Sequence, residues 1–191
     1  MIERIEQHFT DLRGAAEHAR AAAPTVVGWA QRLAPVLEGG GRLITCGNGG
    51  SAAEAQHLSG EFAGRFERDR KPYAAIPLHG DSSALTAVLN DYGEQEVFAR
   101  GVRAHGREGD VLIALSTSGR SQNVVAAVKA AHAIGMTAWA LTGPAPNTLA
   151  AIADDAVAVD APGVATVQEL HLALIHALCR AFDEITGVGS A

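Results

Sequence analysis

Four hydroxyl side chains and a glycine stand together in the segment 116–121, Ser-Thr-Ser-Gly-Arg-Ser, directly after the apolar run 111–115. The residues that follow have the apolar spacing of a helix. A strand that ends in such a loop and opens a helix is a candidate anion site, because free backbone N–H groups and the helix dipole both favour negative charge there. An ordinary capped turn is the alternative. Neutral donors suit the phosphate of a small metabolite, and here they are Ser116, Thr117, Ser118 and Ser121.

The same order of strand, loop and helix occurs earlier, where the apolar run 43–46 is followed by Gly47-Asn48-Gly49-Gly50-Ser51. This loop lacks the spacing of a dinucleotide fingerprint and the lysine of a P-loop, so we do not expect nucleotide hydrolysis. Ser51 is predicted to cap the helix that follows. Asn48 is predicted to reach a substrate hydroxyl from the tight turn.

Two pairs of polar residues on predicted helices could hold a metal or move protons. His57 and Glu61 stand four residues apart and share one helix face, as do Gln168 and His176, which stand eight apart. Two imidazoles, a carboxylate and an amide oxygen could form a four-ligand site for a borderline metal such as zinc. The alternatives are a surface ion pair for His57 with Glu61 and a hydrogen-bonded core histidine for His176. The chain has six further histidines, most of them expected to be bystanders.

Residues 90–93, Asn-Asp-Tyr-Gly, end another predicted helix. Gly93 is expected to form the C-cap with positive φ. Asp91 could also accept hydrogen bonds from a polyol. For Arg65 we favour a surface ion pair, with contact to a phosphate as the alternative.

Short apolar runs alternate with helical patterns from Arg42 onward, which predicts an α/β fold with a doubly wound, five-stranded parallel sheet. Both loops then lie at the carboxyl ends of strands, where such sheets bind ligands. We expect a single domain over 1–191, with a helical hairpin over 1–39 before an α/β core over 40–191. The hairpin is suited to forming oligomers by packing against the same hairpin of another subunit, and the alternative is that it covers one face of the sheet. The predicted strands are 43–46, 73–78, 111–115, 137–142 and 156–159. The predicted helices after the hairpin are 51–65, 82–90, 94–104, 122–134, 147–153 and 165–186.

Composition narrows the class of protein. The 191 residues carry a net charge of −6 without a basic run, so nucleic-acid binding has little support. Cys46 and Cys179 do not form a disulfide framework. Met1 opens onto a charged amphipathic helix rather than a signal peptide, and no apolar run is long enough to span a bilayer. We expect a soluble cytoplasmic protein.

These motifs together resemble the phosphoheptose isomerases, which isomerise sedoheptulose 7-phosphate on the flavodoxin-like sugar-isomerase (SIS) fold. The resemblance runs from about Gly41 to His176. It is carried by Cys46-Gly47-Asn48-Gly49-Gly50-Ser51, Gln56-His57, Glu61 with Gly64-Arg65-Phe66, Leu85-Thr86 with Asn90-Asp91-Tyr92-Gly93, Gly109-Asp110-Val111-Leu112 with Ser116-Thr117-Ser118-Gly119, and Gln168-Glu169-Leu170-His171 with His176.

The resemblance implies a homotetramer with active sites where subunits meet. It implies that Glu61 and His176 are the acid–base residues and that one zinc ion per subunit is held by His57, Glu61, Gln168 and His176. Ser116, Thr117, Ser118 and Ser121 would hold the phosphate, and the rest of the substrate would contact Asn48, Gly49, Gly50, Ser51, Glu61, Asn90, Asp91 and Gln168. Arg120, where many members have Asn, adds a charge beside the phosphate loop.

The expected reaction converts D-sedoheptulose 7-phosphate to D-glycero-D-manno-heptose 7-phosphate through an enediol, as the first step of nucleotide-activated heptose synthesis. Two alternatives stay open. One is an isomerase of another sugar phosphate. The other is a non-catalytic scaffold like the replication-initiator-associating proteins, which the presence of both Glu61 and His176 disfavours.

Overall fold

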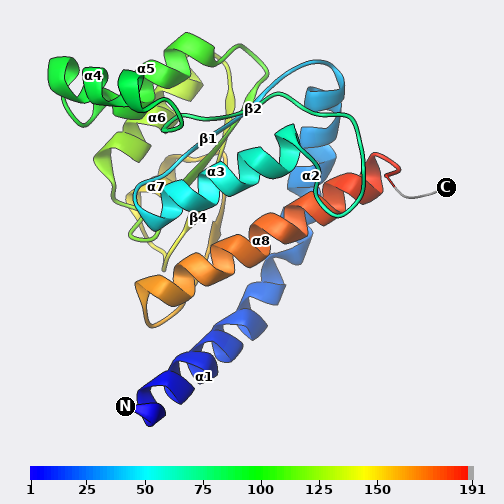
Figure 1. Ribbon diagram of the computed structural model, residues 1–191, viewed down its shortest axis with the longest axis vertical. Helices are drawn as coiled ribbons and strands as arrows, with labels where there is room; N and C mark the ends of the chain where they lie inside the picture. Colours follow the sequence, from blue (N-terminus) through cyan, green and yellow to red (C-terminus); the bar gives the residue numbers. More distant parts are fainter. Residues whose placement is uncertain (189–191) are drawn as a thin grey trace.

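The computed structural model describes residues 1–188, which form a five-stranded sheet with helices on both faces (Figure 1). All strand pairs are parallel, and their order across the sheet is β2-β1-β3-β4-β5. The strand order reverses between β1 and β3, and in sheets of this kind ligands bind beyond the carboxyl ends of the strands at such a reversal. The predicted doubly wound sheet is therefore confirmed. The strands are β1 (Leu43–Cys46), β2 (Ala75–Pro77), β3 (Val111–Ser116), β4 (Thr137–Thr142) and β5 (Asp155–Ala158).

Successive residues of the strands point alternately into two cores, one on each face of the sheet. Val111 and Ile113 are buried with side chains of α2 (Ala23–Glu38), α3 (Gly50–Ala63) and α8 (Val164–Ile185). Leu112 and Ala114 are buried with side chains of α5 (Glu96–His105) and α6 (Gln122–Ala133). Burial on both faces explains why these strands are continuous apolar runs. The helices that follow the N-terminal segment are α3 (Gly50–Ala63), α4 (Ser82–Tyr92), α5 (Glu96–His105), α6 (Gln122–Ala133), α7 (Thr148–Ile152) and α8 (Val164–Ile185).

The predicted N-terminal helices are present as α1 (Ile2–Ala19) and α2 (Ala23–Glu38), with the 3₁₀ turn η1 (Arg20–Ala22) between them. The caps that join them keep right-handed helical backbone angles, so the two helices follow end to end rather than folding back as a hairpin (Figure 1). Arginine and alanine all favour helix, and nothing in η1 reverses the chain. Both α1 and α2 pack against α8.

Element ends differ from the prediction by one or two residues, and most clearly at β2. The strand is shorter than the predicted 73–78 because the Tyr73 N–H donates to the Phe62 carbonyl at the end of α3, at 2.9 Å, rather than to the sheet. The chain between α3 and β2 is thus tied to the helix it leaves. Cys46 and Cys179 are free and buried, and burial raises the pKa of the Cys46 thiol to about 12.

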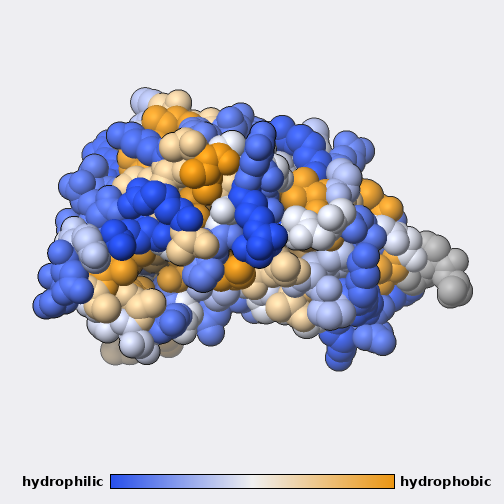
Figure 2. Space-filling view, turned by 90° about the horizontal axis from the view of Figure 1, so that it is seen from above, coloured by the Kyte–Doolittle hydropathy of each residue, from blue (hydrophilic) through white to orange (hydrophobic). Residues whose placement is uncertain are grey.

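Large apolar side chains reach the surface on two helices. On α1, Ile2, Ile5 and Phe9 are exposed, and α4 exposes Leu89 and Tyr92 and buries none of its residues. The face seen in Figure 2 has apolar patches interrupted by polar side chains. Across residues 1–188, none of the helices combines the length and hydropathy needed to cross a membrane.

Candidate active site

The two polar loops lie side by side beyond the carboxyl ends of β1 and β3. The glycine loop (residues 47–51) follows β1 and the serine loop (residues 116–121) follows β3, and these strands are hydrogen-bonded neighbours. A reciprocal pair of hydrogen bonds between side-chain amides joins the glycine loop to the first turn of α6, directly after the serine loop. Asn48 Nδ2 donates to Asn123 Oδ1 at 2.9 Å, and Asn123 Nδ2 donates to Asn48 Oδ1 at 2.8 Å. The chain therefore brings both predicted ligand-binding loops to one place.

The hydroxyls of the serine loop converge instead of capping the helix that follows. Ser121 is the N-cap of α6, but its side chain makes no cap hydrogen bond and lies 3.1 Å from Ser116 Oγ. Ser118 Oγ is 3.5 Å from the same oxygen and accepts from the Arg120 N–H at 3.2 Å. The Val124 N–H donates to Asn123 Oδ1 at 3.0 Å, and the Ser121 hydroxyl leaves the earlier N–H groups of the first turn of α6 to another acceptor, which is the arrangement of an anion site.

The loop that follows β4 packs against the serine loop, and a glycine in each loop allows this close approach. Gly119 has a φ of +60°, and a Cβ there would overlap the Asn147 side chain. A Cβ at Gly143 would overlap the Thr117 carbonyl. The Leu149 N–H donates to the Gly119 carbonyl at 2.8 Å, which fastens the loop to α7.

The glycine loop differs from the prediction at Ser51. The N-cap of α3 is Gly49, with a φ of 56°, so Ser51 lies inside the first turn, is buried and caps nothing. The predicted cap is wrong because glycine at positive φ starts the helix two residues earlier. A Cβ at Gly50 would overlap the Gln168 amide. Gln168 of α8 therefore packs directly on the glycine loop.

Three of the four predicted metal ligands come together between α3 and α8. His57 Nε2 lies 2.9 Å from His176 Nε2 and 3.2 Å from Glu61 Oε1. One ligand atom from each residue lies within 4.8 Å of the other two. The Glu61 side chain is 17% exposed and that of His57 40% exposed, and the Phe66 ring lies 5.7 Å from the His176 ring. Two imidazole nitrogens and a carboxylate oxygen aimed at one point suit either a zinc ion or a chain of proton transfers.

Gln168 stands apart from these three residues. It precedes His176 by eight residues on α8, about 12 Å along the helix axis. Its amide lies at the glycine loop, as the contact with Gly50 shows. One helix therefore presents Gln168 to the loops and His176 to α3.

The remaining predicted residues lie on the surface. Asn90 and Asp91, in the last turn of α4, are exposed and joined by a hydrogen bond of 2.7 Å from Asn90 Nδ2 to Asp91 Oδ1. Gly93 is the C-cap with a φ of 84°, as predicted. Arg65 donates to the Glu67 carbonyl at 3.2 Å rather than to a carboxylate.

Two contacts near the site involve residues that sequence reasoning did not select. Asn123 holds Asn48, and its place in the first turn after the serine loop was the available signal. His171 is fully buried, contacts the Thr142 carbonyl at 3.1 Å, and has Nδ1 3.7 Å from Glu54 Oε2. Glu54 of α3 and His171 of α8 thereby connect the two helices that carry the acid–base candidates.

The fold and its loops define an SIS domain, and the SIS domain family model matches residues 7–143. A phosphoheptose isomerase of Streptomyces coelicolor is 56% identical over 176 residues, which cover 92% of this chain and 76% of that protein. One of Neisseria meningitidis serogroup A is 46% identical over 187 residues, which cover 96% of this chain and 95% of that protein.

Solved structures agree. A phosphoheptose isomerase from Francisella tularensis has a TM-score of 0.90 at 35% identity, with coverage of 96% of this chain and 98% of that one. One from Neisseria gonorrhoeae has a TM-score of 0.89 at 43% identity, with coverage of 95% and 98%. The chain therefore belongs to the phosphoheptose isomerase family and is an isomerase.

Proposed function

We propose that the enzyme converts D-sedoheptulose 7-phosphate to D-glycero-D-manno-heptose 7-phosphate, the first step of nucleotide-activated heptose synthesis. The observation that carries this proposal is the convergence of His57 and Glu61, on the helix that begins at the glycine loop, with His176 of α8. The names of the relatives support the substrate. Isomerisation needs a base and a proton carrier beside the sugar and an anion site for its phosphate, and the chain has candidates for all three.

In this proposal the Glu61 carboxylate takes a proton from C1 of the ketose and returns it to C2, through a cis-enediol. His176 carries the hydroxyl proton from O1 to O2, so the carbonyl moves from C2 to C1. Each positioned acid or base of this kind accelerates proton transfer by about 10²–10⁴-fold. The low exposure of Glu61 supports its role, because a base shielded from water keeps its orientation toward the substrate.

The serine loop is proposed to hold the phosphate through Ser116, Thr117, Ser118 and Ser121. Asn48, Gly49, Gly50, Ser51 and Gln168 are proposed to contact the sugar chain. Support comes from the Asn48–Asn123 amide pair and from the packing of Gln168 on Gly50. Binding the phosphate away from the reacting carbons orients the substrate toward Glu61.

Zinc is proposed to bind His57, Glu61 and His176, and Gln168, whose amide lies at the glycine loop, would join them as the fourth ligand only by turning toward the other three. The converging nitrogen and oxygen atoms of the three residues fit this ion. When bound, zinc would stabilise negative charge that develops on the substrate oxygens. A metal-free acid–base network, with Gln168 on a sugar hydroxyl, is the alternative.

We further propose a single domain that forms a homotetramer, with active sites between subunits. The exposed apolar residues of α1 and α4 suit burial against another subunit. Asn90 and Asp91 lie on the exposed end of α4. An interface along α4 would bring these polar side chains toward the sugar in a neighbouring subunit.

Glu61→Gln tests the proposal, assayed together with the wild type on a panel of ketose phosphates. We expect the wild type to act on sedoheptulose 7-phosphate and the variant to bind it without turnover, because an amide cannot accept the carbon-bound proton. Glu67→Gln, the same change in a surface carboxylate paired with Arg180, is the matched control. Normal turnover by folded Glu61→Gln protein would refute the proposed base. If the wild type acts only on a different ketose phosphate, the proposed substrate is wrong.

A further inference from the structure

An arginine is buried beside the last turn of α3, away from the reacting groups. The Arg70 side chain is 2% exposed and lies in the segment between α3 and β2. Its guanidinium carbon lies 5.3, 5.1 and 5.8 Å from the ring centres of Phe62, Tyr73 and Phe182. An aromatic enclosure of this kind favours a cation and fixes its plane.

The polar contacts of Arg70 reach both helices of the acid–base cluster. Nη2 donates to the Glu61 carbonyl at 2.6 Å, and Nη1 donates to the Phe62 carbonyl at 3.2 Å. Nε forms an ion pair with Asp183 Oδ1 of α8 at 2.9 Å. The carbonyls of a helix C-terminus lack helical partners and attract a cation, so Arg70 fills that need for α3.

Asp183 lies on the same helix as His176, so its ion pair with Arg70 reaches the second acid–base residue. Asp183 follows His176 by seven residues, about two turns along α8. Arg70 therefore ties the backbone of Glu61 to the helix that holds His176. The last turn of a helix frays readily, and Glu61 lies two residues before the end of α3.

We propose that Arg70 is a positioning residue for the isomerase reaction: it sets the spacing of Glu61 and His176 through the Glu61 carbonyl and Asp183. This role rests on the proposed function of Glu61 as the base. Arg70 does not contact the reacting atoms, so its effect is on the alignment of the proton transfer. A buried guanidinium is strongly destabilising when it loses its partners. Conformations that break its contacts with the Glu61 carbonyl or Asp183 are therefore disfavoured, which restricts the two helices to one relative position.

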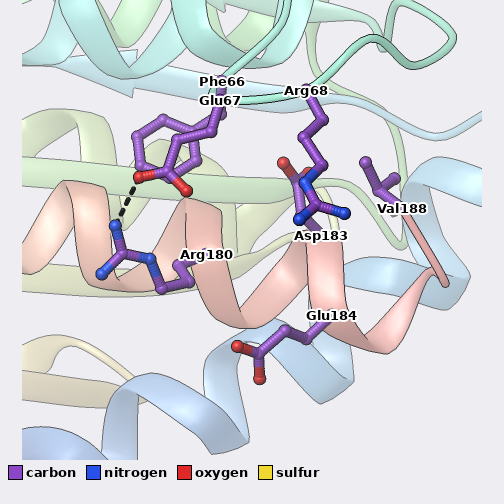
Figure 3. A pocket seen from close by; sticks show the side chains of 7 residues that line it. All are labelled: Phe66, Glu67, Arg68, Arg180, Asp183, Glu184 and Val188. Atoms are coloured by element: carbon purple, nitrogen blue, oxygen red, sulfur yellow. Dashed lines mark hydrogen bonds and ion pairs between the residues drawn. The ribbon is translucent and has the colours of Figure 1, made fainter. Parts of the chain in front are cut away.

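A second ion pair joins the same two segments and provides a control. Arg180 of α8 pairs with Glu67 at the mouth of a cleft of about 330 Å³, which Asp183 also lines (Figure 3). These side chains are 61% and 56% exposed, and the pair is at the surface. Arg180→Lys thus makes the same chemical change between the same segments without touching the Glu61 backbone.

The test compares Arg70→Lys with Arg180→Lys. Lysine keeps the charge but cannot serve two carbonyls and Asp183 with a planar fork. We expect kcat of Arg70→Lys to fall about 10–100-fold, because small misplacements of a reacting group have effects of this size. KM should stay within about twofold, because the serine loop is unchanged. Arg180→Lys should leave both constants close to the wild type.

A kinetic isotope effect separates positioning from a loss of folded protein. With substrate deuterated at C1, a misplaced base makes proton transfer slower and raises the isotope effect on kcat, whereas a smaller folded fraction leaves it unchanged. Asp183→Asn, which removes the ion pair and keeps an acceptor, should change kcat in the same direction and serves if Arg70→Lys does not fold.

An unchanged kcat and isotope effect in both folded variants would overturn the proposal, as would an equal loss in Arg180→Lys. The role of Glu61 is judged separately. If Glu61→Gln is inactive while Arg70→Lys is normal, the positioning role alone fails. If Glu61→Gln turns over normally, the proposed base fails.

Discussion

Replacing Gly119 by alanine should damage the serine loop by an amount that the structure lets us estimate. A non-glycine residue at a φ of +60° costs about 1–2 kcal/mol. The new Cβ would also displace Asn147, whose Oδ1 accepts from the Ala150 N–H at 2.9 Å to cap α7. Loss of such a cap costs about 1 kcal/mol. Asn147 Nδ2 donates to Thr142 Oγ1 at 3.0 Å, and losing this bond adds about 1 kcal/mol. The free energy of unfolding should fall by about 3–4 kcal/mol.

Gly109→Ala is the matched control, because Gly109 has a φ of +85° but open space around its Cβ. Only the backbone cost of about 1–2 kcal/mol applies there. Urea unfolding of both variants and of the wild type gives the difference, which isolates the overlap with Asn147. KM for the phosphorylated substrate should rise in Gly119→Ala and stay constant in Gly109→Ala. Equal destabilisation by the two substitutions would refute the view that Asn147 supports the loop.

Two more predictions concern metal and pH. Protein purified without an affinity tag should contain up to one zinc per subunit, and a chelator or His57→Ala should remove metal and turnover together; full activity in zinc-free protein, by elemental analysis, would exclude the metal role and leave the isomerase. Burial lowers the pKa of His79, whose ring nitrogens have no hydrogen-bond partner in the described chain. Because the unfolded chain then binds the proton more readily, stability is kept above the unfolded pKa of about 6.5 and falls as the pH drops through the lower folded value. The urea midpoint of His79→Gln should therefore fall less than that of the wild type on acidification, and identical pH dependence would contradict this assignment.

Much of the fold was accessible from the sequence because its signals are local. The apolar runs at 43–46 and 111–115 lie between glycine- and serine-rich loops, and burial on both faces makes such runs conspicuous. The spacing of His57 and Glu61 likewise placed both on one helix face. In contrast, the prediction that Ser51 caps α3 was wrong, because the start of α3 depends on the φ of Gly49, which residue types alone do not determine.

Contacts between distant segments were beyond local patterns. The sequence spacing paired Gln168 with His176 on one helix face, but only the crossing of α3 and α8 shows which of them meets His57. Arg70 stands in a charged stretch, Arg-Asp-Arg-Lys over 68–71, that predicts a solvated surface segment. Its burial depends on three aromatic rings from separate parts of the chain, which no local pattern relates to one another.

Helix α3 carries the glycine loop at its start and Glu61 in its last turn. The number of residues in the helix therefore fixes the distance between the glycine loop and the proposed base. Eleven residues separate Gly50 from Glu61, a span of about 16 Å. One residue inserted between them would turn Glu61 by about 100° around the axis and away from His176. The segment between Ala63 and Ala75 is held by the separate contacts of Phe66, Glu67, Arg70 and Tyr73 rather than by a helical repeat. Among related chains, length should therefore vary there and be fixed within the helix.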